Sequence, residues 1–290
     1  MKDDTANVNR AQELLRSSNL KPRKSLGQNF LVDANILDKI VQVAELDSET
    51  GVVEIGPGLG ALTERLVERA GRVVAVEIDR ELVTLLERKF AEEERLIIYN
   101  QDILQVALAR IIEQELGEFK KIKVVANLPY YITSPIIIKL LSEELALESI
   151  TIMVQKEVAE RLSAKPGGKE YGSLTVYVNY YAKVETSFQV SRHVFLPKPE
   201  VDSAVVQIFP RTERELEPVD EKLFFTVLRA SFKHRRKTLN NNLQMELAGQ
   251  VTREDIIQAL DAAKIDGIRR AETLSLTEFI VLSNEIKQIL

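Results

Sequence analysis

Residues 52–60, Val52-Val53-Glu54-Ile55-Gly56-Pro57-Gly58-Leu59-Gly60, decide the fold of this chain. Three of the first four residues are β-branched, as expected of a buried strand, and three glycines follow at every second position. Glycine has no Cβ, so such a turn lets the backbone approach a ligand closely. A buried strand that runs into a glycine-rich turn predicts the first βα unit of a parallel sheet.

Further short apolar runs follow this segment at regular intervals. The first four begin at residues 52, 73, 96 and 122, which are 21 to 26 residues apart, and leucines at helical spacing lie between them. This alternation predicts βαβ units, hence a mostly parallel sheet with helices on both faces. The predicted strands are residues 52–55, 73–76, 96–99, 122–126, 149–155, 182–190 and 203–209, the last two forming a late pair that completes the sheet.

Capping signals and prolines divide the chain further. Ser134-Pro135 predicts a helix start, with serine as the N-cap and proline at the first helical position. The charged segment 210–218 is bounded by prolines and predicts a domain boundary. Beyond it the pattern is helical only, and Ser275-Leu276-Thr277-Glu278 has the spacing of a capping box. We therefore expect one domain over residues 1–210 and a small all-helical domain over 211–290.

The composition excludes several classes of protein. Of 290 residues, 45% are hydrophobic and 29% charged, which is enough to bury a core. There is no cysteine, and the two histidines, His193 and His234, lie far apart, so we expect no metal site and no Ser-His-Asp triad. No apolar run reaches the roughly 18 residues that span a bilayer. The N-terminus has early acids and no signal-like apolar segment, so we expect a cytoplasmic protein, and a monomer.

Each of the first three predicted strands ends in a residue suited to one part of a nucleoside. Ligands of open parallel sheets bind beyond the carboxyl ends of the strands. The spacing G-x-G-x-G from Gly56 is typical of enzymes that use S-adenosylmethionine, although a tight turn alone would also explain it. Glu77, 21 residues later, can accept the ribose hydroxyl hydrogens, and Asp102 can accept from the adenine amine or cap a helix. Asp79 is expected to cap the next helix.

The fourth predicted strand ends in the most specific motif, Asn127-Leu128-Pro129-Tyr130. It is typical of methyltransferases that act on planar amines, whose nitrogen lone pair is delocalised. The Asn127 side-chain carbonyl and the Pro129 backbone carbonyl are both expected to accept from such an NH₂ group. Tyr130 offers a face on which an extruded base can stack. Leu128, where many DNA-type motifs have proline, is expected to shape the space that a monomethylated product needs.

These motifs resemble those of the ribosomal RNA adenine dimethyltransferases, and among them the bacterial enzymes that act on small-subunit RNA. The resemblance spans nearly the whole chain. It implies the Rossmann-like fold of class I methyltransferases with a seven-stranded sheet, and S-adenosylmethionine as cofactor. The matching segments are 24–31, 54–60, 77–79, 101–102, 127–131, 195–203, 232–239 and 269–274.

The resemblance also implies a set of contact residues. Phe195 would be a second aromatic face against the target base, with core packing as the alternative. The implied substrate is a pair of adjacent adenosines in the 3′-terminal hairpin of 16S RNA, presented by an assembling 30S subunit. Residues implied to contact the cofactor are Asn29, Leu31, Gly56, Glu77, Asp102 and Asn127.

Two basic clusters are candidates for RNA contact in a chain of net charge −5. Between residues 222 and 245 there are six Lys or Arg and no acid, which favours contact with phosphates over a merely solvated face. The first cluster holds Lys21, Arg23 and Lys24; the second holds Arg229, Lys233, Arg235, Arg236 and Lys237.

Three alternative functions stay open from the sequence. One is a methyltransferase of large-subunit RNA, which shares the core motifs. Another is a non-catalytic RNA-binding factor on the same fold. The third is a protein-glutamine methyltransferase, which uses a similar motif on a planar amide.

Overall fold

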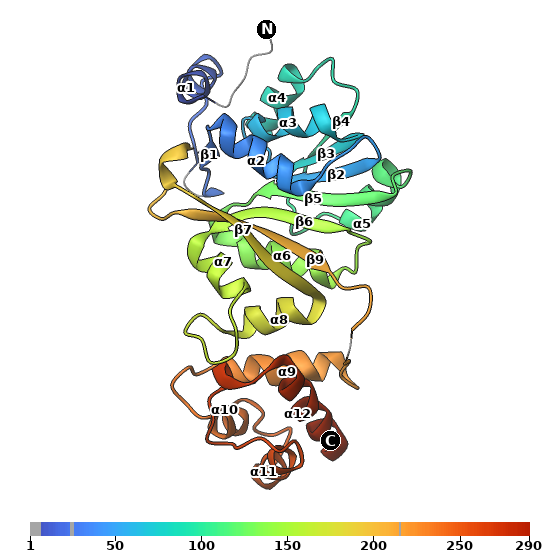
Figure 1. Cartoon of the computed structure of the whole chain (residues 1–290), viewed down its shortest axis with the longest axis vertical. Helices are drawn as coiled ribbons and strands as arrows, with labels where there is room; N and C mark the ends of the chain where they lie inside the picture. The colour runs from blue at the N-terminus through green and yellow to red at the C-terminus, as the bar shows by residue number, and fades with distance from the viewer. Residues whose placement is uncertain (1–6, 24–25, 215) are drawn as a thin grey trace. The chain divides into compact units, whose positions relative to one another are not determined.

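The computed structural model describes residues 7–23, 26–214 and 216–290 (Figure 1). The chain divides into two compact units. Unit 1 comprises residues 1–159 and 184–210, and unit 2 comprises residues 160–183 and 211–290. Each unit is described separately below.

Unit 1 is built on a seven-stranded sheet in the order β4-β3-β2-β5-β6-β9-β7, with β2 at residues Thr50–Ile55 and β5 at Lys121–Asn127 beside it (Figure 1). Neighbours from β4 to β6 pair in parallel, and β9 pairs antiparallel to β6. The predicted fold class, a mostly parallel sheet with helices, is therefore confirmed. The other strands are β3 (Arg72–Glu77), β4 (Leu96–Asn100), β6 (Ser149–Gln155), β7 (Ala182–Val190) and β9 (Ser203–Pro210).

Apolar side chains on both faces of the sheet form the core of unit 1. On one face, Val52 and Val125 pack against α2 (Ala34–Ala44) and α3 (Ala61–Arg69). All residues of β2 are buried, which explains why its sequence is mostly apolar, with Glu54 as the one acid. The remaining helical segments of this part are α1 (Val8–Ser17), α4 (Arg80–Lys89), α5 (Leu108–Ile111) with a π-turn (Ile112–Leu116), α6 (Thr133–Ser142), α7 (Lys156–Leu162) and 3₁₀ turns at Tyr130–Ile132 and Arg192–Val194.

A two-stranded sheet that the sequence pattern did not predict joins two distant segments. Strand β1 (Phe30–Leu31) pairs antiparallel with β8 (Phe195–Leu196). A strand of two residues is too short to show an alternation of apolar and polar residues, so the sequence pattern cannot predict it. The pairing brings the segment ahead of α2 to the edge of the main fold.

Unit 2 is helical in its described residues. Helices α9 (Glu221–Phe232) and α12 (Leu276–Ile289) pack together, with the ring centroids of Phe232 and Phe279 5.6 Å apart, and Phe224, Phe279 and Leu282 are fully buried. The capping box predicted at Ser275 is confirmed, since its side chain accepts from the N–H of Glu278. The other helical segments are α8 (Ser173–Tyr181), α10 (Leu239–Glu246), α11 (Arg253–Ala262) and a 3₁₀ turn (Ala271–Thr273).

The sequence predicts N-cap residues for two helices, α6 and α4. Helix α6 begins at Thr133 rather than Pro135, so the proline occupies the third helical position and the expected serine cap is wrong. Proline is tolerated there because the N–H groups of the first turn have no helical partner. Asp79 does cap α4, accepting from the N–H of Glu81. Within the described ranges, every helix is too short or too polar to cross a membrane.

Candidate functional site

The glycine turn after β2 leaves open space beside its first glycine. Gly56, Gly58 and Gly60 all have positive φ, between +58° and +76°, a region that side chains with a Cβ rarely adopt. A Cβ at Gly58 would lie 2.9 Å from the ring of Phe30, so that position is closed by packing. At Gly56 the nearest atoms to a Cβ would be 4.0 Å away, on Asn127 and Pro129. The turn is therefore packed on one side and open at Gly56.

Glu77, the last residue of β3, points its carboxylate at this turn. Oε1 accepts from the N–H of Asp79 at 2.9 Å, and Oε2 from the N–H of Gly58 at 3.3 Å. The residue is only 6% exposed. Burial raises the pKa of Glu77, and the two backbone N–H groups oppose that shift. Each oxygen keeps a further lone pair, so the carboxylate is oriented and can still accept from the hydroxyls of a ligand.

Two adjoining pockets lie at the carboxyl ends of the strands. The carboxylate pocket is lined by Glu77 and Asp102, among others, and the asparagine pocket by Asn29 and Asn127. Gly56 belongs to both. This placement follows from the parallel sheet, because the ends of β2, β3, β4 and β5 meet at one edge. Leu26, Gln28 and Pro129 are the other shared lining residues.

The amide of Asn127 has a defined orientation. Its Nδ2 donates to the backbone carbonyl of Asn29 at 3.2 Å, and the Nδ2 of Asn29 donates in turn to the carbonyl of Gly27 at 3.1 Å. With Nδ2 engaged in this way, Oδ1 of Asn127 is the atom left to accept a proton from a ligand. This orientation agrees with the expectation from the motif, in which the side-chain carbonyl of Asn127 accepts from an amine.

The backbone carbonyl of Pro129 is engaged elsewhere, which the sequence did not reveal. It accepts from the N–H of Ile132 at 3.3 Å and from the hydroxyl of Thr133 at 3.1 Å. A carbonyl oxygen has two lone pairs, so both are used. Within the described part of the chain, no donor is directed at the backbone carbonyl of Leu128, one residue earlier. Leu128, rather than Pro129, therefore has the free carbonyl beside Asn127.

The predicted aromatic residues lie in different environments. Tyr130 is half-buried, lines the asparagine pocket and shares a 2.7 Å hydrogen bond with the hydroxyl of Ser203. Phe195 is 4% exposed and packs in the core with Leu31 and Met153. The alternative of core packing thus describes Phe195 in this structure. Leu31 is likewise a core residue, and its side chain lines neither pocket.

The two pockets suit a cationic nucleoside without phosphates. Their described lining residues include two acids, Glu77 and Asp102, and no lysine or arginine. Phosphate sites that lie beside a glycine turn and a helix N-terminus normally add a cationic side chain. Acidic walls beside an open glycine backbone instead favour an adenosyl group carrying a sulfonium. Oδ2 of Asp102 is bonded to the side chain of Gln105 and Oδ1 to the N–H of Leu104, which fixes this carboxylate at the pocket wall.

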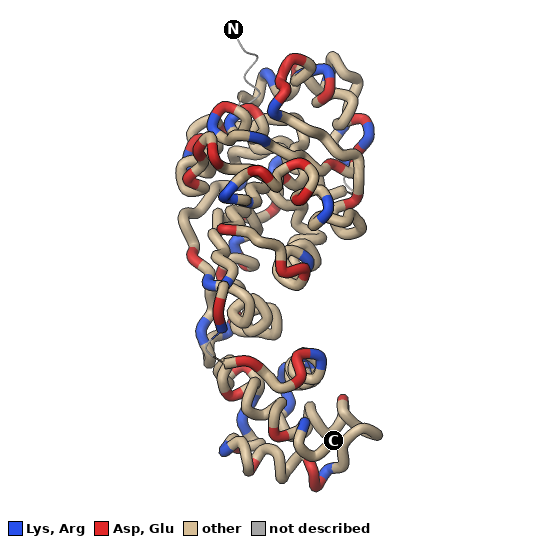
Figure 2. The backbone as a smooth tube through the Cα atoms, turned by 90° about the vertical axis from the view of Figure 1, so that its right-hand side faces the viewer, with Lys and Arg blue, Asp and Glu red and all other residues tan. Residues whose placement is uncertain are grey.

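The first basic cluster is only partly free. Lys21 is exposed, but Arg23 forms ion pairs with Asp79 at 3.4 Å and Glu81 at 2.9 Å. Lys24 lies outside the described residues. Figure 2 shows lysine and arginine interspersed with acids along the chain, so any RNA contact depends on local clusters.

The second basic cluster lies mainly in the loop between α9 and α10, although the sequence pattern beyond residue 218 predicts helices only. Lys233, Arg236 and Lys237 are exposed there. Arg235 is tied down instead: its guanidinium donates to the carbonyl of Lys169 and lies 3.7 Å from the carboxylate of Glu272. Arg229, on α9, is exposed and donates to the hydroxyl of Thr226 at 3.2 Å.

Two residues near the pockets were not singled out by the sequence. Gln28 lines both pockets and donates from Nε2 to Asp79 at 3.0 Å. Glu54 lies in β2 below the glycine turn, and within the described residues neither of its carboxyl oxygens has a partner. An acid inside an otherwise apolar strand is the signal that could have marked Glu54. Gln28 carries no such signal.

The chain is similar in sequence to known proteins. A family model described as ribosomal RNA adenine dimethylase matches residues 19–282. A protein of Geobacillus sp. (strain WCH70), named ribosomal RNA small subunit methyltransferase A, is 48% identical over all of both chains. Its namesake in Geobacillus thermodenitrificans is 49% identical over 99% of this chain and 98% of that one.

Two solved structures are similar as well. A dimethyladenosine transferase from Plasmodium falciparum has a TM-score of 0.70 and 29% identity, covering 86% of this chain and 94% of that one. The 23S rRNA methyltransferase ErmE has a TM-score of 0.63 and 27% identity, covering 89% of this chain and 100% of the other.

Proposed function

The chain belongs to the ribosomal RNA adenine dimethylase family, and from that premise we propose how its pockets act and on which RNA. It is a methyltransferase that uses S-adenosylmethionine to methylate adenine in ribosomal RNA. We propose that its target is a pair of adjacent adenosines in the 3′-terminal hairpin of small-subunit RNA, within an assembling 30S subunit. The names of the relatives, which specify the small subunit, support this choice.

The carboxylate pocket is proposed to hold the adenosyl part of the donor. Glu77 would accept from the ribose hydroxyls, Asp102 from the adenine amine, and the open backbone at Gly56 would lie against the amino acid part. When bound, S-adenosylmethionine supplies a methyl group on positively charged sulfur, already activated for displacement. Asn29 contributes by its hydrogen bonds to the loop and to Asn127.

The asparagine pocket is proposed to hold the target base. Oδ1 of Asn127 and the free carbonyl of Leu128 would accept the two hydrogens of the adenine amine, in place of the pair with Pro129 that the sequence suggested. Two acceptors draw the nitrogen towards a pyramidal shape and make its lone pair available. That lone pair would take the methyl group as the carbon–sulfur bond breaks towards sulfur, and the alkylated nitrogen would lose one proton to water. Positioning the reacting atoms accounts for most of the rate.

Tyr130 is proposed as the stacking face for the base. Its hydroxyl is held by Ser203, so the ring plane is fixed before the base arrives. Stacking of a base on an aromatic ring is worth roughly 1–3 kcal/mol. Phe195 would support the site through the β1–β8 pair, which carries the segment next to Asn29.

RNA contact is proposed for four exposed residues of the two basic clusters, Lys21, Lys233, Arg236 and Lys237, and RNA recognition for the helical unit 2. The α9–α10 loop offers Lys233, Arg236 and Lys237, while Lys21 is exposed in the N-terminal segment. Phosphate contacts of this kind give affinity without sequence information, so the choice of adenosines would rest on the shape of the hairpin loop.

The single observation that carries the proposal is the orientation of Asn127 beside a turn that is open at Gly56. The test is methyl transfer from labelled S-adenosylmethionine to small and large ribosomal subunits purified from cells that lack this enzyme, followed by nucleoside mapping. We expect N6,N6-dimethyladenosine at two adjacent positions of small-subunit RNA. Label confined to large-subunit RNA, as the name of ErmE describes for that protein, would contradict the proposal.

A further inference from the structure

The segment just ahead of β1 forms part of the wall of both pockets. Leu26 and Gln28 line the carboxylate pocket and the asparagine pocket, and Gly27 and Asn29 line the second. A Cβ on Gly27 would lie 3.0 Å from the ring of Tyr131, so the segment packs closely against the end of the Asn127 motif. The shape of the donor site therefore depends on where this segment lies.

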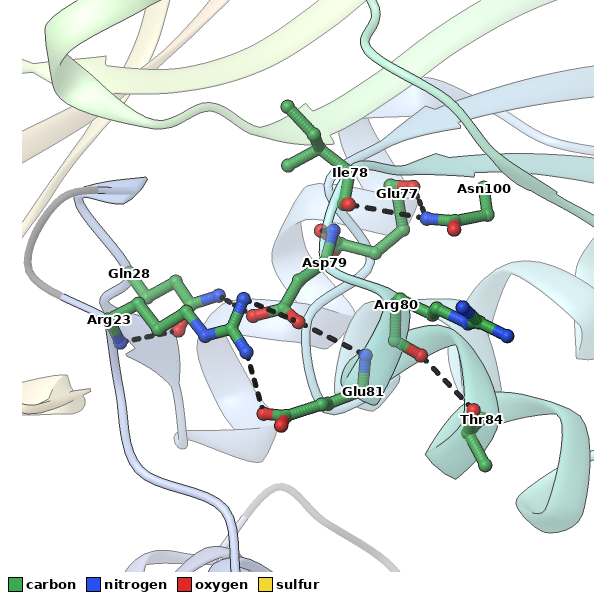
Figure 3. Close-up of polar contacts among 9 residues, drawn as sticks. All are labelled: Arg23, Gln28, Glu77, Ile78, Asp79, Arg80, Glu81, Thr84 and Asn100. Atoms are coloured by element: carbon green, nitrogen blue, oxygen red, sulfur yellow. Dashed lines mark hydrogen bonds and ion pairs between the residues drawn. The ribbon is translucent and has the colours of Figure 1, made fainter.

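In the described part of the chain, the side chains of Gln28 and Arg23 hold this segment near the strand end that carries Glu77. Nε2 of Gln28 donates to Oδ2 of Asp79 at 3.0 Å, and its Oε1 accepts from the N–H of Arg23 at 2.7 Å. The guanidinium of Arg23 lies 3.4 Å from Oδ1 of Asp79 and 2.9 Å from the carboxylate of Glu81. Figure 3 shows Arg23 and Gln28 side by side, both directed at Asp79.

Asp79 connects these contacts to the ribose carboxylate. Its N–H donates to Oε1 of Glu77, while Oδ1 caps α4 by accepting from the N–H of Glu81 (Figure 3). The Asp79 side chain is 3% exposed. A carboxylate buried to this extent is costly unless hydrogen-bonded and paired, and Gln28 and Arg23 supply that compensation from the N-terminal segment.

We propose that Arg23, Gln28 and Asp79 form a latch that holds the segment from Leu26 to Asn29 closed over the methyl donor. The three are positioning residues for donor binding, and Arg23 acts in the latch rather than as a contact to RNA. The latch rests on the donor site proposed above, yet it can be tested without RNA.

Arg23 gives the sharpest test because it lines neither pocket. An effect of Arg23→Ala on donor affinity therefore cannot come from a lost contact with the donor. Arg95 is a matched control in the same unit: its side chain is 46% exposed against 45% for Arg23, and it is paired with Glu93 at 2.9 Å. It lies just before β4, at the end of the strands away from the pockets.

The experiment measures the affinity and dissociation rate of S-adenosylhomocysteine for the full chain by calorimetry and stopped flow. For Arg23→Ala, which removes the ion pairs of Arg23 with Asp79 and Glu81, we expect affinity to fall about threefold, since a half-exposed arginine contributes modestly. For Gln28→Glu, which keeps the size but sets a negative charge against Asp79, we expect a fall of about tenfold or more. In both, dissociation should be faster, and hydrogen exchange of residues 26–29 should increase while that of α2 does not.

Steady-state methylation of RNA distinguishes a loss of donor positioning from a general loss of activity. At saturating donor, kcat of Arg23→Ala should stay within about twofold of wild type, while the KM for the donor rises. Arg95→Ala should change neither. The latch is overturned if Arg23→Ala and Gln28→Glu bind S-adenosylhomocysteine like Arg95→Ala, or if hydrogen exchange of residues 26–29 is unchanged. A wild-type chain that binds S-adenosylhomocysteine but methylates no RNA would contradict the proposed function and leave the latch intact.

Discussion

The residues of the site differ in which of their polar groups are already hydrogen-bonded within the chain. Asn127 is oriented by its bond to the backbone of Asn29, and Tyr130 by its bond to Ser203, before any substrate binds. Such preorganisation means that little rearrangement is needed at the moment of reaction. The Pro129 carbonyl, by contrast, is occupied by the turn that starts α6. The same short motif thus contains groups that can still accept from a ligand and groups that the turn already engages.

Asn127→Ala should separate turnover from donor binding. Removing Oδ1 takes one acceptor from the adenine amine, so we expect kcat to fall on the order of 100-fold, as for other positioned polar groups. Binding of S-adenosylhomocysteine should weaken much less, because Glu77 and Asp102 are untouched. Single-turnover methylation of subunits and calorimetry measure the two quantities. An unchanged single-turnover rate would refute the role given to Asn127.

Glu54 should make stability depend on pH. Burial raises its pKa from 4.5 to about 8, an effect that the charge of Lys89 offsets only in part. Between these values the folded chain binds a proton that the unfolded chain does not, so the free energy of unfolding falls as pH rises through this window. Glu54→Gln cannot ionise, so its stability relative to wild type should increase by about 1–3 kcal/mol from pH 5 to pH 8. Urea unfolding at both pH values tests this, and an equal difference at the two would contradict it.

At the scale of elements, the α9–α10 loop separates two kinds of basic residue. Lys233, Arg236 and Lys237 extend from the loop, whereas Arg235 ties it to Lys169 and Glu272. The N–H of Gly167 also donates to the backbone of Glu272, at 2.7 Å, so the loop of residues 165–169 is held to the same place. Arg235 thus connects the α9–α10 loop to the loop of residues 165–169.

Replacing Arg236 and Lys237 together by alanine should weaken RNA binding and reduce the slope of log affinity against log salt by about 1–2. The single variants Arg236→Ala and Arg235→Ala each remove one positive charge from the same loop, and the matched control is Arg235→Ala because Arg235 is paired with Glu272. We expect a smaller change in its slope. Filter binding to small-subunit RNA at several salt concentrations measures these slopes. If the wild type and all variants have the same slope, the loop does not contact phosphates.

At the scale of the whole molecule, helix α8 belongs with the C-terminal helices, although it precedes β7 and β9 in the chain. The hydroxyls of Tyr180 and Tyr181 both donate to the carboxylate of Glu221, at 3.0 and 2.7 Å. Arg214 lies over both rings, 4.5 and 5.0 Å from their centroids. Unit 2 is therefore built from two stretches of sequence separated by strands of unit 1.

A chain ending at Pro210 should consequently be less stable than the full chain. Truncation removes Arg214, Glu221 and Phe225 from the rings of α8 and leaves an apolar surface uncovered. We expect a lower Tm, stronger binding of a hydrophobic dye and a tendency to aggregate. Calorimetry and light scattering test this. A truncated chain that stays monomeric with the Tm of the full chain would show that α8 needs no partner.

The sequence by itself determined the sheet and the strand ends that carry the site. Apolar runs at intervals of 21 to 26 residues predict parallel strands, and parallel strands necessarily bring their carboxyl ends to one edge. Gly56, Glu77, Asp102 and Asn127 could therefore be assigned to one place without knowing a single contact.

Only the tertiary structure decided which polar groups are already engaged. Gln28 meets Asp79 across 51 residues of sequence and Tyr130 meets Ser203 across 73, and no local pattern encodes such pairs. For the same reason Arg23 and Arg235, indistinguishable by sequence from their basic neighbours, turn out to be paired, and Phe195 turns out to be buried. Periodicity reports which face of an element is apolar; which donor reaches which acceptor depends on how distant elements pack.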